Sequence, residues 1–121
     1  MAADFWAAAE DRFQDSEILY GKGRWTGAVY RARFGLECFL KARLLRALGT
    51  DQLPSKWHTH NLWELFKGTH KRAVPRTVAT TLAEINAVDV TIRYNAEVFD
   101  EETASRLLAK IRGIQRWLAR P

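Results

Sequence analysis

The sequence has little cysteine, proline or glycine: one, three and seven residues in 121. The single Cys38 excludes an internal disulfide framework and cannot build a thiolate metal site alone. No apolar run approaches the roughly 18 residues that a membrane-spanning helix needs. The first ten residues also lack the basic segment and uninterrupted apolar stretch of a secretory signal. We therefore expect a cytoplasmic protein that does not enter a membrane.

What the sequence does contain is apolar and basic. Hydrophobic residues make up 47% of the chain, with five tryptophans and six phenylalanines. A chain of this length can bury a substantial core, so we expect one domain over residues 1–121. The formal net charge is +5. A surface of this charge attracts polyanions, although the basic residues are spread along the chain rather than gathered in one tract.

The apolar residues follow a helical period, and no window alternates strictly between apolar and polar positions. This pattern favours an all-α fold, an antiparallel up-and-down bundle of four to five helices. The predicted helices are about Asp4–Tyr20, Arg24–Leu48, Leu62 to about Thr69, one opened by Pro75, and Asp100 to about Ala119. Loop or irregular backbone is expected over Thr50–His60 and Thr91–Phe99.

Local signals mark several of these ends. Gly49 can adopt the left-handed conformation that closes a helix. Asn61 followed by Glu64 resembles an N-cap with an acidic third residue. Pro75 suits a first helical turn because that turn has no use for its missing N–H. The acidic run from Asp100 to Glu102 is explained better by capping the last helix than by acid–base catalysis.

The helix predicted over Arg24–Leu48 carries a charged stripe of Arg33, Glu37 and Lys41 between two apolar arcs. Two apolar arcs indicate neighbours on both sides, with the charges directed into a groove. The alternative is a solvated ladder, because Glu37 precedes Lys41 by four residues, a spacing that stabilises an exposed helix. The sequence leaves both interpretations open.

Two further positions could hold an anion. His60 lies at the predicted start of a helix, where free backbone amides can share an anion with an imidazole; it could equally bond a loop carbonyl. Arg93 and Tyr94 offer a guanidinium for phosphate and a ring for base stacking. They could instead pack into the bundle. We predict no metal site, because His58 and His60 have no further ligand at zinc spacing and His70 falls on another element. No cofactor-binding motif is present.

Four segments, in this order, resemble the HEPN domain, a small all-helical family named for higher eukaryotes and prokaryotes and for nucleotide binding. They are Gly23-Arg24-Trp25 leading into Ala28–Ala42, then Thr59-His60-Asn61-Leu62 with Leu65, then Arg93-Tyr94, then the final amphipathic helix. The resemblance spans nearly the whole chain. It implies a helical bundle that dimerises and binds a nucleotide or RNA in its groove. It also implies a nucleotidyltransferase partner chain, as in a toxin–antitoxin-like pair.

Ribonuclease members of that family carry an arginine followed, after four to six residues, by a histidine. Here the positions that follow Arg93 at this spacing hold Val98 and Phe99 or the residues just before them, and no histidine. The leading hypothesis is therefore a non-catalytic, homodimeric module. In it Arg93 and Lys41 bind phosphate, Tyr94 stacks, and His60 with Arg33 orients the ligand. Arg33, Glu37 and Lys41 form the floor of the ligand pocket.

Two alternatives remain. One is a divergent metal-independent endoribonuclease, a toxin, with His60 as general base and Arg93 stabilising the charged phosphorane. The other is a purely structural interaction domain, in which Arg33, Glu37 and Lys41 satisfy one another as a buried network.

Overall fold

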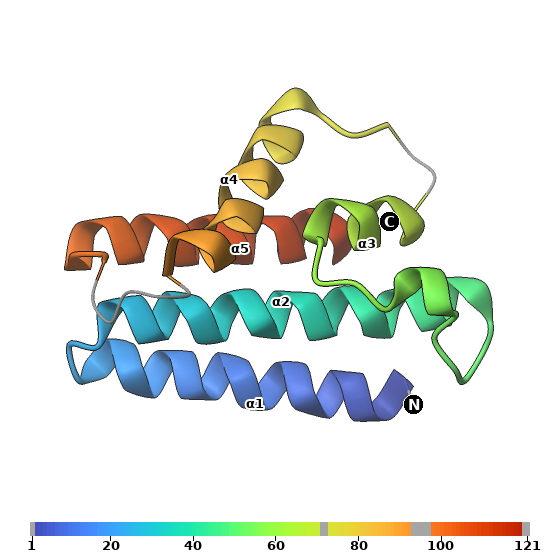
Figure 1. Ribbon diagram of the computed structural model, residues 1–121, viewed down its shortest axis with the longest axis horizontal. Coiled ribbons are helices and arrows are strands. Elements are labelled where there is room, and N and C mark those ends of the chain that lie inside the picture. Colours follow the sequence, from blue (N-terminus) through green and yellow to red (C-terminus); the bar gives the residue numbers. More distant parts are fainter. Residues whose placement is uncertain (1, 71–72, 93–97, 120–121) are drawn as a thin grey trace.

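The computed structural model describes residues 2–70, 73–92 and 98–119, and for residues 89–92 it describes the backbone only. Five α-helices and one short 3₁₀ helix follow in order, and these residues contain no strand (Figure 1). They are α1 (Ala2–Gly21), α2 (Trp25–Leu48), η1 (Ser55–Trp57), α3 (Leu62–Gly68), α4 (Arg76–Ile92) and α5 (Glu101–Ala119). The predicted all-α bundle is confirmed. Within the described residues no helix is both long and apolar enough to cross a membrane.

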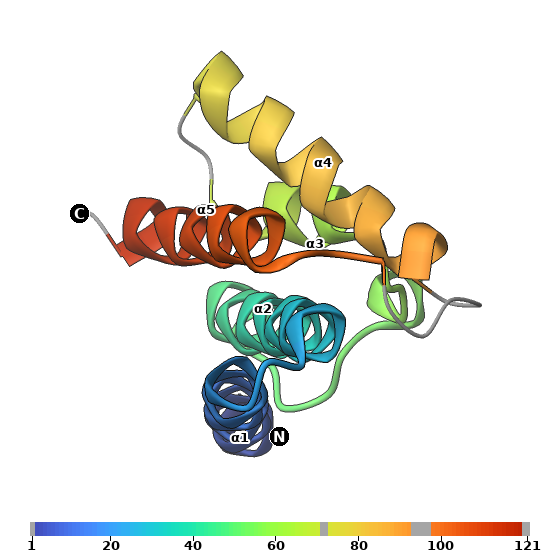
Figure 2. The ribbon, with the colours of Figure 1, turned by 90° about the vertical axis from the view of Figure 1, so that its left-hand side faces the viewer.

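Helix α2 is the centre of the bundle and contacts each of the other four α-helices. Figure 2 shows it between α1 and α5. Helix α1 runs antiparallel to α2, α5 runs in the direction of α2, and α4 crosses them obliquely (Figures 1 and 2). Of the 24 residues of α2, 13 are buried. This burial confirms that α2 has neighbours on both sides.

A tight turn and close packing join α1 to α2. Gly23 takes the left-handed backbone conformation (φ +74°) that glycine adopts without steric cost. Phe13 of α1 packs over Gly35 of α2, where an added Cβ would lie 3.1 Å from the ring. Ser16, buried on α1, donates a hydrogen bond to the carbonyl of Ala28 at 2.7 Å. The two helices therefore form a closely packed antiparallel hairpin.

The main apolar core lies on the other side of α2. Leu36, Leu40 and Leu44 of α2 meet Phe66 of α3, and α4 and α5 complete the cluster. Its members from α4 and α5 are fully or almost fully buried: Leu82, Ile85, Ile111, Ile114 and Leu118. Full burial of each such side chain stabilises the fold by about 1.5–3 kcal/mol. This core fixes α3 and α4 against the charged stripe of α2.

The predicted helix ends are largely confirmed. Gly49 closes α2 with φ +66°, and its N–H bonds the carbonyls of Leu45 and Arg46. The Asn61 side chain accepts hydrogen bonds from the backbone N–H groups of Trp63 and Glu64 at the start of α3. The carbonyl of Pro75 accepts the first helical bond of α4, from Ala79.

Two boundaries differ from the prediction. Thr91 and Ile92, expected to be irregular, form the end of α4, because no glycine or proline stops the helix before them. The expected loop over Thr50–His60 contains η1, one turn that brings Trp57 against the core.

Candidate functional site

Two charged side chains of α2, Arg33 and Glu37, are buried, with residue exposures of 5% and 3%. Lys41, one turn further on, has a side chain that is 13% exposed. The solvated-ladder interpretation of this stripe is therefore wrong. The physical reason is that α3 and α4 pack over this face of α2, so its charges must find partners within the protein.

Arg33 ties α2 to two later segments of the chain. Its Nη2 donates to the backbone carbonyl of His60 at 3.1 Å and to Asn86 Oδ1 at 3.2 Å. Its Nη1 lies 3.7 Å from Glu37 Oε1. One guanidinium thus connects α2 with the start of α3 and with α4, which matches the fixed fork geometry of arginine donors.

Asn86 of α4 completes this connection, and sequence reasoning missed it. Its Oδ1 also accepts from the backbone N–H of Leu62 at 2.9 Å, while its Nδ2 donates to Asn61 Oδ1 at 3.2 Å. The sequence feature that could have revealed this role is the position of Asn86, a polar residue directly after the inward-facing Ile85. A polar group on the packed side of a helix requires hydrogen-bond partners there.

Glu37 binds two groups that face outward. Its Oε2 lies 3.1 Å from Lys41 Nζ, and both carboxylate oxygens lie 3.0–3.1 Å from His60 Nδ1. The side chain of His60 is nevertheless 78% exposed. Because a carboxylate only accepts hydrogen bonds, the proton of the His60 ring lies on Nδ1. The other ring nitrogen, Nε2, does not take part in this contact.

Lys41 and His60 line a surface hollow of about 470 Å³ together with four residues from elsewhere: Phe5, Gln52, Leu53 and His58. Phe5 comes from the start of α1, and the other three come from the segment between α2 and α3. The N-terminal helix and this connecting segment therefore form the walls, and α2 supplies the cation.

His58 has the opposite ring attachment to His60. Its Nε2 lies 2.8 Å from the carbonyl of Leu53, an acceptor, so Nε2 carries the proton and Nδ1 is left over. Among the residues that the structure describes, the hollow thus holds one ammonium and two imidazoles, and each imidazole bonds its neighbours through one nitrogen.

The predicted site residues divide into three groups. Lys41 and His60 reach the hollow, whereas Arg33 and Glu37 lie behind it and position the imidazole. Arg93 and Tyr94 lie outside the described residues. In the sequence His58 is a candidate metal ligand only, and Phe5 gives no signal because it lies on α1, far along the chain from Lys41, His58 and His60.

Neither a metal centre nor a reactive thiol is found in the part of the chain that the structure describes. No group of three or more histidine, cysteine, aspartate or glutamate side chains there could hold a metal ion. Burial, and to a smaller extent the charge of Glu37, raises the pKa of the Cys38 thiol. The thiol therefore stays neutral and is a poor nucleophile. The chemistry of the site is that of cations and imidazoles.

Comparison with known proteins agrees with the resemblance in the sequence. The family model of the HEPN domain matches residues 2–120. No curated protein and no solved structure matches the chain. Since the matched region is essentially the whole sequence and the fold is an all-α bundle, the chain belongs to the HEPN domain family.

Proposed function

We propose that this HEPN domain is a non-catalytic module that binds a nucleotide or RNA through the hollow lined by Lys41, His58 and His60. The family is associated with nucleotides and RNA. The observation that carries the proposal is the convergence of Lys41 and two singly anchored imidazoles on one hollow. Its volume, about 470 Å³, falls within the range of small-molecule sites.

Each wall of the hollow has a role in this proposal. The Lys41 ammonium binds a phosphate oxygen as a point charge, and the imidazoles of His58 and His60 offer polar contacts beside it. The ring of Phe5 offers a stacking surface for a base, as aromatic side chains do in proteins that bind single strands. Arg93 binds phosphate and Tyr94 stacks, as the sequence predicts.

The position of Lys41 supports an anionic ligand. Its side chain is 13% exposed, and it lines the hollow. An anion entering the hollow meets the Lys41 ammonium in a partly desolvated setting, where attraction is stronger than in water.

The test is titration of fluorescently labelled mononucleotides and single-stranded RNA at low and high salt. Lys41→Gln and Arg93→Ala should each weaken binding by about tenfold, since each removes a charged hydrogen bond. Lys22→Gln is the matched control, because Lys22 is an exposed lysine at the α1–α2 turn, at the opposite end of α2. Absence of saturable binding, or equal losses with Lys22→Gln, would refute the proposal.

One observation favours a second candidate function, a metal-independent endoribonuclease. His60 is held by a buried carboxylate through Nδ1, the arrangement that orients a histidine general base in many hydrolases. In this alternative His60 accepts the proton of the ribose hydroxyl and Arg93 stabilises the phosphorane. Pure protein should then cut RNA in the presence of a chelator, and His60→Ala should not. RNA left intact, or cut equally well by the variant, removes this candidate.

We also propose that the domain is a cytoplasmic homodimer that docks a nucleotidyltransferase chain. The support is the family resemblance. Sedimentation equilibrium should give a mass near twice the 13.9 kDa of the chain. A monomer mass at micromolar concentration would contradict the dimer, and failure to co-purify with a co-expressed nucleotidyltransferase from the same operon would contradict the partner.

A further inference from the structure

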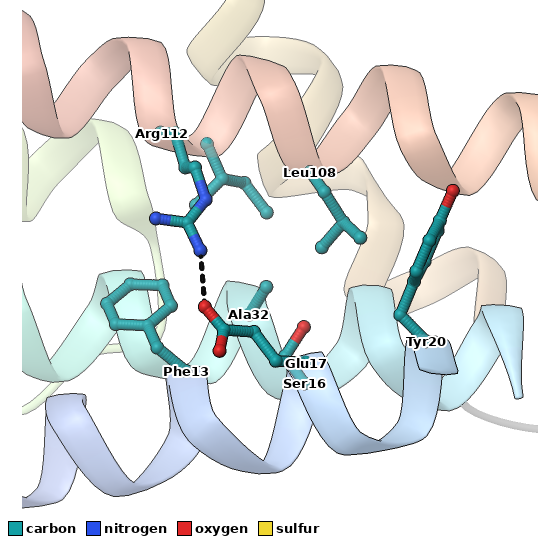
Figure 3. Close-up of a pocket in the computed structure, with 8 residues that line it drawn as sticks. Phe13, Ser16, Glu17, Tyr20, Ala32, Leu108 and Arg112 are labelled. Atoms are coloured by element: carbon teal, nitrogen blue, oxygen red, sulfur yellow. Dashed lines mark hydrogen bonds and ion pairs between the residues drawn. The ribbon is translucent and has the colours of Figure 1, made fainter. Parts of the chain in front are cut away.

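A second cavity, of about 220 Å³, lies between α1, α2 and α5 and shares no residue with the hollow (Figure 3). The cavity exists because α1 and α5 both flank α2, and the short side chain of Ala32 on α2 does not fill the space between them. Phe13, Leu108 and Ile111 form apolar walls around it. Figure 3 shows Arg112 at one end and Tyr20 at the other.

The apolar part of this cavity has the size of one side chain. A cavity of about 150 Å³ with similar walls is known to hold benzene. A space of 220 Å³ therefore accommodates a branched aliphatic or phenyl group and leaves little room beyond it. The hydroxyl of Ser16, which also lines the cavity, is already bonded to the carbonyl of Ala28. The interior thus selects an apolar group.

The polar part consists of one ion pair. Arg112 Nη2 of α5 donates to Glu17 Oε1 of α1 at 2.7 Å (Figure 3). Within the described residues this contact uses one of the five N–H donors of Arg112 and one oxygen of Glu17. A donor array and an acceptor therefore remain side by side at the end of an apolar cavity. They fit a ligand that carries a carboxylate and an ammonium on one carbon next to an apolar side chain.

We propose that this cavity binds a free α-amino acid with a branched aliphatic or phenyl side chain. Its carboxylate lies on Arg112, its ammonium on Glu17, and its side chain between Ala32, Leu108 and Ile111. The zwitterion is favoured over a simple acid or amine because only the zwitterion engages both members of the pair. Glycine fits the ion pair but leaves the apolar space empty.

The test is isothermal titration calorimetry of the full chain with L-leucine and L-phenylalanine. Saturable binding is expected for at least one of them. Glycine, 4-methylpentanoate and 3-methylbutylamine, which lack the side chain, the ammonium and the carboxylate respectively, should bind about tenfold more weakly or less. No binding of either amino acid, or equal binding of one of the three truncated compounds, overturns the proposal.

Two exposed substitutions locate the ligand. Arg112→Gln and Glu17→Gln should each weaken binding by about tenfold, because each removes one charged contact. Arg106→Gln is the control, since Arg106 lies on α5 like Arg112 but forms an exposed pair with Glu84 of α4. Ala32→Leu should fill the cavity and abolish binding; if this buried change prevents folding, the exposed variants decide. Unchanged binding in Arg112→Gln, or an equal loss in Arg106→Gln, overturns the proposal.

Discussion

The exposed imidazole of His60 is held in place by Glu37, a carboxylate that is itself only 3% exposed. A buried negative charge thus fixes the direction of a ring whose other nitrogen is left over for a ligand. Arg33, also bonded to Glu37, holds the backbone of the same histidine. Two residues of α2 thus fix the position of both the ring and the backbone of His60.

Glu37→Ala should lower the free energy of unfolding by about 3–5 kcal/mol, because it removes the carboxylate that faces the buried Arg33 guanidinium and the Lys41 ammonium. Urea denaturation measures the change. Glu64→Ala is the control: Glu64 pairs with Lys67 on the surface, and its loss should cost less than about 1 kcal/mol. Equal effects of the two substitutions would show that the buried pair does not contribute to stability.

Asn86→Ala should cost about 1–3 kcal/mol, since it leaves the N–H of Leu62 and a nitrogen of Arg33 without this acceptor. The loss of this acceptor should also make hydrogen exchange at the Leu62 amide faster, which NMR measures. Asn61→Ala, which removes the α3 cap, should cost about 1 kcal/mol and expose the Trp63 and Glu64 amides instead. Unaltered exchange at Leu62 in Asn86→Ala would argue against this role.

Substitution by alanine should change the stability of the fold in opposite directions at two helical glycines, Gly68 and Gly113. At Gly68 an added Cβ would lie 2.7 Å from Leu44 Cδ1 and 2.9 Å from Trp57, so Gly68→Ala should destabilise the fold by about 1–3 kcal/mol. At Gly113 nothing lies within 4 Å, so Gly113→Ala should stabilise α5 by up to about 1 kcal/mol. Thermal unfolding compares them. A stabilised Gly68→Ala variant would mean that Leu44 and Trp57 can move aside.

The surface pair at Glu84 predicts a pH dependence of stability. A hydrogen bond from Lys110, with the charges of Lys110 and Arg106, holds the pKa of Glu84 below its ordinary value of 4.5. A carboxyl whose pKa is lower in the folded state stabilises the fold above 4.5, and this contribution is lost as the pH falls through the folded pKa. Glu84→Gln should therefore reduce stability near neutral pH, by less than about 1 kcal/mol, and have a vanishing effect in strong acid. Urea denaturation at both pH values measures this difference, and a pH-independent effect would contradict it.

The sequence predicted the helices and offered the buried stripe as one of two interpretations, because both depend on a local period. Arg33, Glu37 and Lys41 are one turn apart, and the apolar residues on either side require neighbours. His60 was predicted at the start of a helix from Asn61 and Glu64, which act within that same turn.

The hollow itself could not be predicted in this way. Phe5, Lys41 and His58 come together only through the tertiary fold, from three segments without a common pattern. Asn86 reaches Arg33 across 53 positions. For Arg93 and Tyr94, outside the described residues, the phosphate and stacking roles stay predictions.

The position of Arg33 also bears on how the chain folds. The contacts that join α1 to α2 lie within the first 48 residues, and such short-range contacts form early. The partners that cover Arg33 come later, from His60 and Asn86. In a nascent hairpin of α1 and α2 we therefore expect the charged stripe to remain in water. We expect it to lose that water when α3 and α4 dock on α2, which would couple formation of the charge network to completion of the bundle.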